Sequence, residues 1–343
     1  MTRNVQVEGS VGGDDTLPRK TISAIMVTYF TGPLLARAID ALRMQENVEE
    51  VIVVNNGNWD GAVEDAINAS LSDDSDGVAD GAEINVISGH GNVGFAAACN
   101  LGAGQAKGDY LLFINPDAIL PPGGATMLVA DGDTQERPWM MGAKLINPDG
   151  TEQQGSRRET LTPWRAFVEA TKLYKIAPRH PYFRRFNLHG DPCPEEITRV
   201  PTISGACFCL HRDDYFAVDG MDEAYFLHVE DVDFCLRFAE AGGGVYFDPH
   251  VEVLHFKSSS RVNPLFVEAR KTNSTIRYFG AHFSDVYPAA FLWLVAGSLW
   301  VMFGLKSAIH GVRRFLGVLG LRRRRGSVVY KRASEYSARR GSR

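Results

Sequence analysis

Continuous apolar runs alternate with segments of helical periodicity through the first 120 residues. Between the first two runs, Leu34, Leu35, Ala38, Ile39 and Leu42 follow the spacing of an amphipathic helix. Strands that alternate with helices form right-handed βαβ units around a parallel sheet. This half of the chain therefore predicts an open α/β nucleotide-binding architecture. The predicted strands are residues 21–30, 50–57, 83–88 and 109–117.

The pattern after residue 120 is less regular. Residues 151–200 mix arginines with aromatic residues and indicate no particular fold. Residues 200–211 and 245–256 are typical of strands, and the second run ends at His255. Between them we expect a helix from about Glu230, because apolar residues follow at helical spacing and glycines end the run. That register places three acids in its first turn: Glu230, Asp231 and Asp233.

The tetrapeptide INPD occurs twice, at residues 114–117 and 146–149. Gly150 follows the second copy, and N-P-D-G is a strong turn signal, so a turn is sufficient to explain it. The first copy ends an apolar strand. Ligands bind beyond the carboxyl ends of strands in open α/β sheets, so we expect Asp117 at a ligand site.

Gly89, Gly91 and Gly94 spell G-x-G-x-x-G, the dinucleotide-binding fingerprint, between a predicted strand and a predicted helix. In dinucleotide enzymes this string belongs to the first βα unit, and an acid about 20 residues further on ends the next strand. Here a complete βα unit precedes the string, and Asp109 starts its strand instead of ending it. A dinucleotide-dependent oxidoreductase is the alternative to the function developed below.

The net charge of −5 conceals a strong asymmetry. Residues 306–343 contain twelve Lys or Arg and a single acid, Glu335, so the rest of the chain is strongly acidic. A basic tail of this kind favours nucleic acid or an anionic membrane surface as its partner. We do not expect nucleic acid, because the folded part is acidic and carries no recognisable nucleic-acid-binding motif.

The cysteines and the N-terminus indicate the compartment. Residues 1–20 contain no apolar stretch of the secretory-signal type and are expected to be disordered. Five cysteines without a C-x-x-C pair indicate a reduced, cytoplasmic setting. Cys207, Cys209 and His211 alternate and would share one face of a strand. A metal site there is an alternative, but a buried strand face is favoured, because free cysteine behaves as a small hydrophobic residue.

Residues 286–305 form an uncharged run of 20 residues, about long enough to span a bilayer. A single span would place the basic tail across the membrane from a cytoplasmic folded domain, against the positive-inside tendency. We therefore expect in-plane or re-entrant attachment, with the arginines on anionic lipid. Packing on the protein core is the alternative, because Pro288 and Gly297 make a poor uninterrupted span.

Several ordered motifs across residues 21–260 resemble glycosyltransferase family 2, the inverting enzymes of GT-A fold. VTYF resembles the first strand of that family, VVNNGN its V-V-D-N-x-S turn, GNVGFAAACN its N-x-G-[FY]-[AG]-x-x-x-N segment and FINPD its D-x-D equivalent. The block SGACFCLHRDDYFAVDGMDEAYFLHVEDVDFCLRFAEAG resembles its acceptor side, with EDVD at the catalytic position, and VLHFKSSSR resembles its later histidine motif. The arrangement is most similar to bacterial rhamnosyltransferases that act on polyprenyl-diphosphate-linked sugars.

The resemblance implies that a divalent cation, Mg²⁺ or Mn²⁺, neutralises the diphosphate of a nucleotide-sugar donor. Asp117 is expected to anchor this cation. His255, by resemblance, is a second ligand, and it suits Mn²⁺ better than Mg²⁺. Asn115 stands where the D-x-D pattern has an acid and is a poor ligand, so we expect one protein carboxylate on the metal.

Inversion requires a base that removes the proton of the acceptor hydroxyl. The resemblance assigns this role to Asp231, supported by Glu230, and a helix N-terminus favours anionic carboxylates. A helix-capping pair of acids is the alternative. The family commonly has Asp where Asn55 stands, and Asn can accept a base N–H through its amide oxygen without the charge. The residues expected beside the nucleotide sugar are Thr28, Tyr29, Asn55, Asn56, Asn92, Gly94, Phe95, Asn115 and Asp117.

Together with the basic tail, the resemblance predicts an enzyme peripheral on the cytoplasmic face of the plasma membrane, acting in cell-envelope glycan synthesis. The first choice of donor is dTDP-rhamnose, with uridine or guanosine sugars open, and the acceptor is a polyprenyl-diphosphate-linked or polysaccharide glycan. The expected organisation is a disordered N-terminus (1–20), a GT-A domain (21–270), hydrophobic and amphipathic helices (271–321) and a basic tail (322–343).

Overall fold

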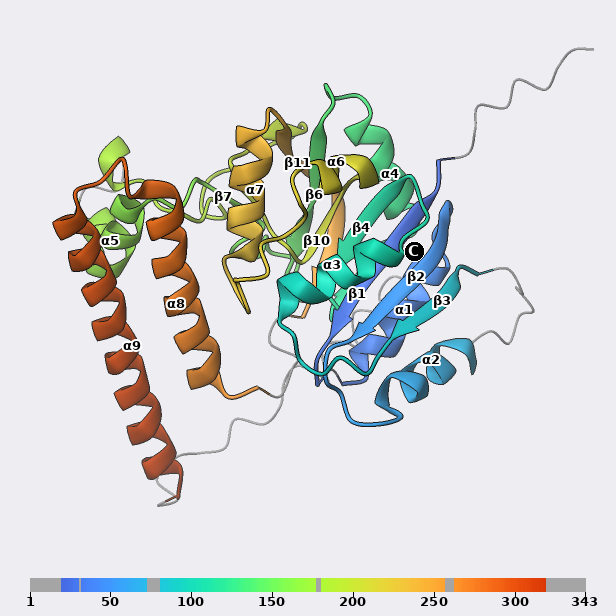
Figure 1. Cartoon of the computed structure of the whole chain (residues 1–343), viewed down its shortest axis with the longest axis horizontal. Coiled ribbons are helices and arrows are strands. Elements are labelled where there is room, and N and C mark those ends of the chain that lie inside the picture. The colour runs from blue at the N-terminus through green and yellow to red at the C-terminus, as the bar shows by residue number, and fades with distance from the viewer. Residues whose placement is uncertain (1–19, 31, 73–80, 177–179, 257–261, 319–343) are drawn as a thin grey trace, which may run out of the picture.

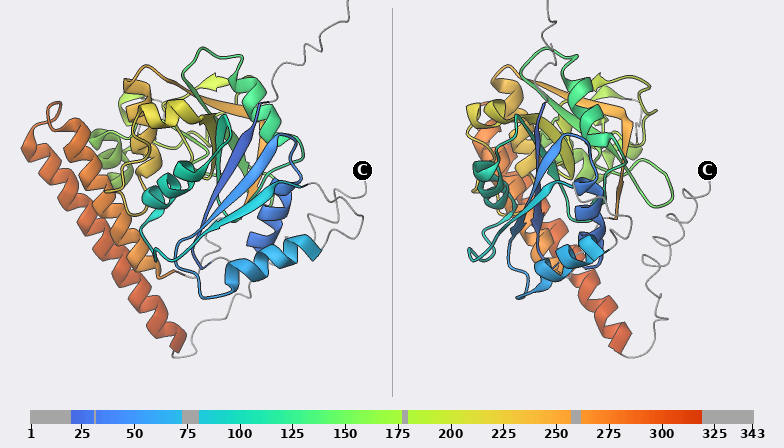
Figure 2. Two further views of the ribbon diagram at one scale, coloured as in Figure 1. Left: turned by 45° about the vertical axis from the view of Figure 1, so that its right-hand side comes forward. Right: turned by 90° about the vertical axis from the view of Figure 1, so that its right-hand side faces the viewer.

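The computed structural model describes residues 20–30, 32–72, 81–176, 180–256 and 262–318 (Figure 1). Apart from Lys20, the predicted disordered N-terminus and the basic tail 322–343 lie outside these ranges. The described residues form one large sheet with helices on both faces and a pair of long helices beside it (Figures 1 and 2). The predicted α/β architecture is confirmed.

Nine strands form the main sheet: β1 (Ile22–Thr28), β2 (Val48–Asn55), β3 (Glu83–Ile87), β4 (Tyr110–Ile114), β5 (Ala118–Ile119), β6 (Trp139–Ile146), β8 (Thr198–Arg199), β10 (Cys207–His211) and β11 (Gly244–His255). Their order is β3-β2-β1-β4-β10-β6-β11-β5, with β8 paired to β11. The strands β1 to β4 are parallel, as the alternation of strands and helices predicts. The order of strands along the sheet reverses between β1 and β4, and ligands bind at such a switch point.

Helices cover both faces of this sheet. On one face lie α1 (Leu34–Arg43), α2 (Ala62–Ser72) and α4 (Gly124–Gly132), and on the other lie α3 (Phe95–Gln105), α6 (Arg212–Ala217) and α7 (Glu230–Glu240). Alternate residues of β1 enter the two cores: Ala24 and Met26 belong to the first, Ile25 and Val27 to the second. Burial on both faces explains why this strand is a continuous apolar run.

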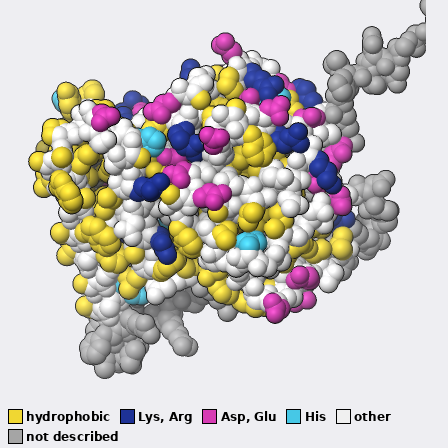
Figure 3. Space-filling view, viewed as in Figure 1, with side chains coloured by type: hydrophobic (Ala, Val, Ile, Leu, Met, Phe, Trp, Pro, Cys, Tyr) yellow, Lys and Arg dark blue, Asp and Glu magenta, His cyan; other side chains and the backbone are white. Residues whose placement is uncertain are grey.

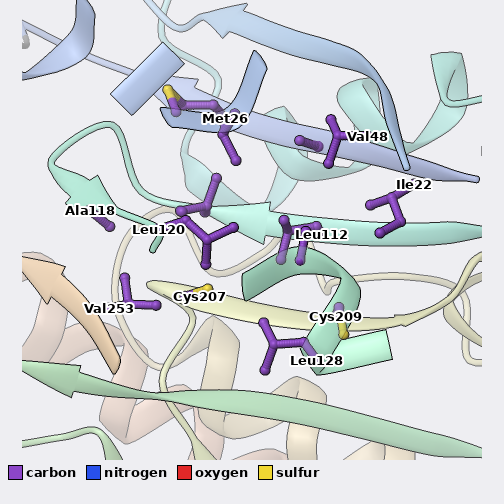
Figure 4. Packing of buried hydrophobic residues seen from close by; sticks show 14 of the residues in the cluster. Ile22, Met26, Val48, Leu112, Ala118, Leu120, Leu128, Cys207, Cys209 and Val253 are labelled. Atoms are coloured by element: carbon purple, nitrogen blue, oxygen red, sulfur yellow. The ribbon is translucent and has the colours of Figure 1, made fainter. Parts of the chain in front are cut away.

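The run 200–211 does not form the single strand that its pattern predicts. A turn at residues 204–206 divides it into β9 (Thr202–Ile203), which pairs with β7 (Arg157–Arg158), and β10. β10 runs antiparallel between β4 and β6, an exception in a sheet predicted to be parallel. Its Cys207 and Cys209 lie in the core near Leu112 and Leu128 (Figure 4), so the buried strand face predicted for them is confirmed.

Two C-terminal helices, α8 (Pro264–Phe283) and α9 (Ala289–Val318), stand side by side at the edge of the molecule, with α9 on the outside (Figures 1 and 2). The expected domain boundary at residue 270 falls within α8, which continues unbroken through it. Pro288 precedes α9 and therefore does not interrupt it, and Gly297 lies within the continuous helix.

One face of α9 packs on the protein and the other does not. Val295 is fully buried, and the ring of Phe291 lies 6.4 Å from that of Trp164 in α5 (Pro163–Thr171). On the outer face Trp293 is 78% exposed and Val301 63% exposed. In the space-filling view, hydrophobic side chains gather over α9 and charged side chains over the sheet domain (Figure 3). By length and composition, residues Ala289–Val312 could cross a membrane.

Candidate functional site

The ends of four strands bring most of the predicted site residues to one edge of the sheet. Thr28, Asn55 and His255 are the last residues of β1, β2 and β11. Asn115 follows β4 directly, and Asp117 lies between β4 and β5. These strands run in the same direction, so their carboxyl ends meet although the residues are distant in sequence.

Asp117 and His255 face each other across this edge. Oδ1 of Asp117 lies 3.2 Å from Nε2 of His255, and both residues are buried. The backbone fixes the pair: His255 is opposite Ala118 in the β5–β11 ladder, and the N–H of Phe256 donates to the C=O of Asp117 at 3.0 Å. The side-chain nitrogen of Asn115 lies 3.4 Å from the same imidazole nitrogen. The structure thus brings together the two residues predicted as metal ligands.

A carboxylate and an imidazole at this distance can share one divalent cation. Within the described ranges, no group of three or more His, Cys, Asp or Glu side chains is arranged to hold a metal. A cation between Asp117 and His255 has coordination positions left for further ligands, and diphosphate oxygens are suitable ligands. The residues fit a cation that binds together with a nucleoside diphosphate.

Glu230 and Asp231 are the first two residues of α7, as predicted. The two residues before them, His228 and Val229, have φ of 66° and 75°. This left-handed conformation is unusual for a β-branched residue, and such strain is retained where surrounding contacts hold it. One such contact comes from α8, where the Ser274 hydroxyl donates to the C=O of Leu227 at 3.2 Å.

Arg158 of β7 forms an ion pair with Asp231. A terminal nitrogen of its guanidinium lies 2.5 Å from Oδ2 of Asp231, and the N–H of Gly205 donates to the same oxygen at 3.1 Å. Burial raises the pKa of Asp231, but the charge and hydrogen bond of Arg158, together with the Gly205 N–H, lower it below its ordinary value. Asp231 is therefore held as a carboxylate.

Glu230 has a different environment. Its side chain is buried, and Oε2 accepts no hydrogen bond from the described residues. Burial, and then the charge of Asp231, raise the pKa of the Glu230 carboxyl. The pKa of Glu230 is thus raised and that of Asp231 lowered, so Asp231 is favoured as the ionised member of the pair.

The start of β10 connects the two halves of the site. The N–H of Asn115 donates to the C=O of Ala206 at 2.9 Å, while the preceding Gly205 holds Asp231. A Cβ on Gly205 would lie 3.1 Å from the Cβ of Asp231, which leaves little room for any other residue there. The end of β4 and the start of α7 are thereby fixed relative to each other.

The predicted glycine turn is built around Gly94, with φ of 92°. A Cβ on Gly94 would lie 2.7 Å from the carbonyl oxygen of Phe226, and this same oxygen accepts the N–H of Phe95. Asn56 supports the turn from β2: its amide donates to Asn92 and to Gly94, and its oxygen accepts the N–H of Val93. Asn56 is 4% exposed, so its observed contacts are with the turn.

The glycine string does not have the setting of a dinucleotide fingerprint. It follows β3, the edge strand of the sheet, and not the central strand β1. A Cβ on Gly89 or Gly91 would meet nothing within 4 Å, whereas the fingerprint uses glycine where backbones approach closely. The oxidoreductase alternative has no support from this geometry.

The predicted nucleotide-side residues at β1 and β2 form a tight turn with Asn58, which sequence reasoning missed. Thr28 is fully buried, and its C=O accepts the side-chain amide of Asn58 at 2.9 Å. Oδ1 of Asn55 accepts both the backbone N–H and the side-chain amide of Asn58, each at 2.9 Å. In the observed conformation this oxygen accepts from Asn58, and its predicted contact with a base N–H stays a prediction.

Next to this turn, Tyr29 was predicted at the site, whereas its aromatic neighbours Phe30 and Trp59 were missed. The ring of Tyr29 packs edge-on against Phe30 at 4.4 Å between centroids, and Phe30 lies 5.7 Å from Trp59. Trp59 is 58% exposed. The G-N-W-D turn after β2 was the available signal, because a large aromatic in an exposed turn is typical of a binding surface.

Arg158 and Gln153 were missed as well. Both lie in residues 151–200, where the sequence shows no periodicity that would place a side chain. Arg158 contacts Asp231, and Gln153 lies 2.6 Å from Nδ1 of His255. In the sequence, each is simply a polar residue next to short strand-like fragments. Such residues are too common to identify a site.

Comparison with known proteins agrees with this geometry. The profile of glycosyl transferase family 2 matches residues 23–187. Over 301 residues the chain is 28% identical to the N-acetylglucosaminyl-diphospho-decaprenol L-rhamnosyltransferase of Mycobacterium tuberculosis, covering 83% of this chain and 91% of that protein.

Two solved structures share the fold. GalNAc-T7 with UDP, GalNAc and Mn²⁺ has a TM-score of 0.54 at 14% identity, over 79% of this chain and about half (49%) of that chain. The mannosyltransferase PcManGT of Pyrobaculum calidifontis, in complex with GDP-Man and Mn²⁺, has a TM-score of 0.50 at 14% identity, over 98% of this chain and 84% of that one. The sheet order, the family profile and the near full-length relative lead to one conclusion: the chain contains a family 2 glycosyltransferase domain and has a GT-A fold.

Proposed function

We propose that this protein is a metal-dependent inverting glycosyltransferase that transfers a sugar, with rhamnose as first choice, from a nucleoside diphosphate sugar to a polyprenyl-diphosphate-linked acceptor. The observation that carries the proposal is the joint placement of an Asp–His pair and an ionised Asp231 at the carboxyl edge of the sheet. The name of the M. tuberculosis relative supports both rhamnose and the lipid-linked acceptor.

On the donor side, Asp117 and His255 would hold the cation together with the diphosphate. A bound divalent cation supplies neutralisation of the charge that develops on the diphosphate leaving group. An imidazole ligand favours Mn²⁺ over Mg²⁺, and both similar structures are complexes with Mn²⁺. The aromatic group Tyr29, Phe30 and Trp59 offers a surface on which the nucleotide base can stack.

On the acceptor side, Asp231 is the proposed base. As the acceptor hydroxyl oxygen forms a bond to the anomeric carbon, its proton passes to the Asp231 carboxylate. The bond between that carbon and the diphosphate breaks, and the nucleoside diphosphate leaves. The low pKa of Asp231 keeps it ready to accept the proton at neutral pH.

A donor panel tests the reaction. Purified protein, membrane lipid extract and Mn²⁺ are combined with dTDP-rhamnose or with uridine and guanosine diphosphate sugars, and nucleoside diphosphate release is measured. We expect the largest release with dTDP-rhamnose, dependence on the lipid extract and loss of activity with chelator. Release that is equally fast in excess chelator would remove the metal from the proposal, and release with another donor alone would replace rhamnose.

The same proposal places α9 on the cytoplasmic surface of the membrane, beside a polyprenyl-linked acceptor. Its outer face exposes Trp293, Leu294, Val301 and Leu305, residues typical of an interfacial helix. Because its inner face packs on α8 and α5, in-plane attachment agrees with the observed packing better than a separate span.

Sedimentation with anionic vesicles tests this placement. The full-length protein should pellet with the vesicles, and the double variant Trp293→Glu, Val301→Glu should remain in the supernatant. Leu101→Glu, at an exposed apolar position on α3 that is 41% accessible, is the matched control and should pellet like the unmodified protein. If the unmodified protein stays soluble with vesicles at low salt, the membrane placement is wrong.

A further inference from the structure

The sequence of the second INPD segment, residues 146–149, predicts only a turn. In the structure, hydrogen bonds of Gln153 connect this turn to His255. The segment does form a turn: the N–H of Gly150 donates to the C=O of Asn147 at 2.8 Å. Beyond the turn, Gln153 extends into the protein and is only 3% exposed. Its amide nitrogen Nε2 donates to the backbone C=O of His255 at 3.0 Å and to Oδ1 of Asn147 at 3.1 Å, while Oε1 lies 2.6 Å from Nδ1 of His255.

The chemistry of these groups fixes the direction of each hydrogen bond. A backbone carbonyl oxygen can only accept, so the atom of Gln153 that faces the C=O of His255 must be its NH₂ group. Oε1 is then the atom that faces Nδ1 of His255, and Nδ1 must carry the hydrogen.

The hydrogen bonds within the turn assign the same donor and acceptor roles to the Gln153 amide. The carboxylate of Asp149 accepts the hydroxyl of Thr151 at 2.6 Å, and Oγ1 of Thr151 accepts the amide of Asn147 at 3.0 Å. The oxygen of Asn147 therefore faces the NH₂ group of Gln153. Four successive hydrogen bonds run in one direction from His255 to Asp149.

In a neutral imidazole that carries its hydrogen on Nδ1, the lone pair is on Nε2, which is the atom 3.2 Å from Asp117. Histidines that bind a metal through one nitrogen usually donate a hydrogen bond from the other, which fixes both ring orientation and tautomer. We propose that Gln153 is the positioning residue of the donor site: it holds His255 in the Nδ1-protonated tautomer and presents Nε2 to the cation. This inference rests on the cation of the proposed function.

Two measurements test the tautomer of His255 and the binding of the cation separately. The first is the tautomer of His255, read from ¹⁵N chemical shifts of ¹⁵N-histidine-labelled, metal-free protein between neutral and alkaline pH. The His255 signal is assigned by its loss in His255→Gln. The second is Mn²⁺ affinity in the presence of dTDP, measured from the electron paramagnetic resonance of free Mn²⁺.

Gln153→Leu should lose the Nδ1-protonated form and weaken Mn²⁺ binding about 10- to 100-fold, the usual effect of removing a partner that orients a metal ligand. The neighbouring Gln154 is exposed, so Gln154→Leu is the matched control and should change neither measurement. If Gln153→Leu does not fold, Gln153→Met keeps the length of the side chain, removes both polar atoms and should likewise lose the Nδ1-protonated form.

An Nε2-protonated His255 in the unmodified protein, or a tautomer that does not change in Gln153→Leu or Gln153→Met, would overturn the proposal. If the unmodified protein has the expected tautomer, and loses it in Gln153→Leu, but binds no Mn²⁺, the positioning role stands and the metal of the proposed function fails. The two failures are therefore distinguishable.

Discussion

The two halves of the site hold their acidic groups by different means. On the donor side, Asp117 and His255 sit at strand ends, and the ladder between β5 and β11 sets their distance. On the acceptor side, Asp231 is the second residue of a helix that follows two left-handed residues, and side chains from β7 and α8 hold that region. Backbone hydrogen bonds set the separation of Asp117 and His255, whereas the position of Asp231 depends on the ion pair with Arg158 in addition to the Gly205 N–H. We therefore expect the acceptor side to be the more sensitive half.

Asp231→Asn should produce the largest effect, because it removes the proposed base while preserving shape. We expect kcat to fall by a factor on the order of 10² to 10⁴, with donor binding close to that of the unmodified protein. Asp213→Asn, in the first turn of α6, is the control for loss of an acid at a helix start. A far larger loss in Glu230→Gln than in Asp231→Asn would reverse the assignment of the two acids.

Asp117→Asn removes the charge that would hold the cation, and His255→Ala removes one neutral ligand. We expect both to raise the Mn²⁺ concentration needed for half-maximal activity, and Asp117→Asn to exceed the 10- to 100-fold typical of outer partners of a metal. Titration of activity with Mn²⁺ at saturating donor measures the difference. Unchanged Mn²⁺ dependence in Asp117→Asn would show that the donor side does not bind the metal.

Arg158→Gln tests whether the ion pair sets the protonation state of Asp231. Without the guanidinium the pKa of Asp231 should rise, so the carboxylate is protonated, and activity lost, at a higher pH than in the unmodified protein. At alkaline pH, where Asp231 is ionised in both proteins, kcat should differ least. Arg158→Lys retains the charge and should keep the acid limb of the pH profile near its original position. A uniform loss at every pH would indicate a purely structural role.

Asp149→Asn should have the smallest effect. Asp149 lies in the second INPD turn, at the far end of the hydrogen-bond series, and the C=O of His255 fixes Gln153 independently of it. We expect turnover to change by about twofold or less, as is usual for a surface substitution. A loss comparable with that of Asp117→Asn would show that the turn, and not the sheet, determines the donor side.

The sequence predicted the parts of the site that follow regular elements. Asp117 closely follows a strand, His255 ends one and Glu230 starts a helix, so periodicity located them, and the family motifs paired them. Arg158 and Gln153 could not be found in this way, because their contacts with Asp231 and His255 join residues 73 and 102 positions apart. Sequence pattern also could not reveal that Asn56 is buried, because the direction of a side chain in a turn depends on its neighbours.

The interior position of β11 has a consequence for the order in which the protein is made. β11 is the last strand along the sequence of the described residues, yet it lies between β6 and β5. During synthesis from the N-terminus, the edge of β6 that will receive β11 stays unpaired until residues 244–255 have left the ribosome, and an unpaired edge is prone to aggregate. The nascent polypeptide can complete β1 to β4 early, but Asp117 meets His255 only at this late insertion, across 138 residues. The donor side is thus assembled after most of the catalytic domain has been synthesised.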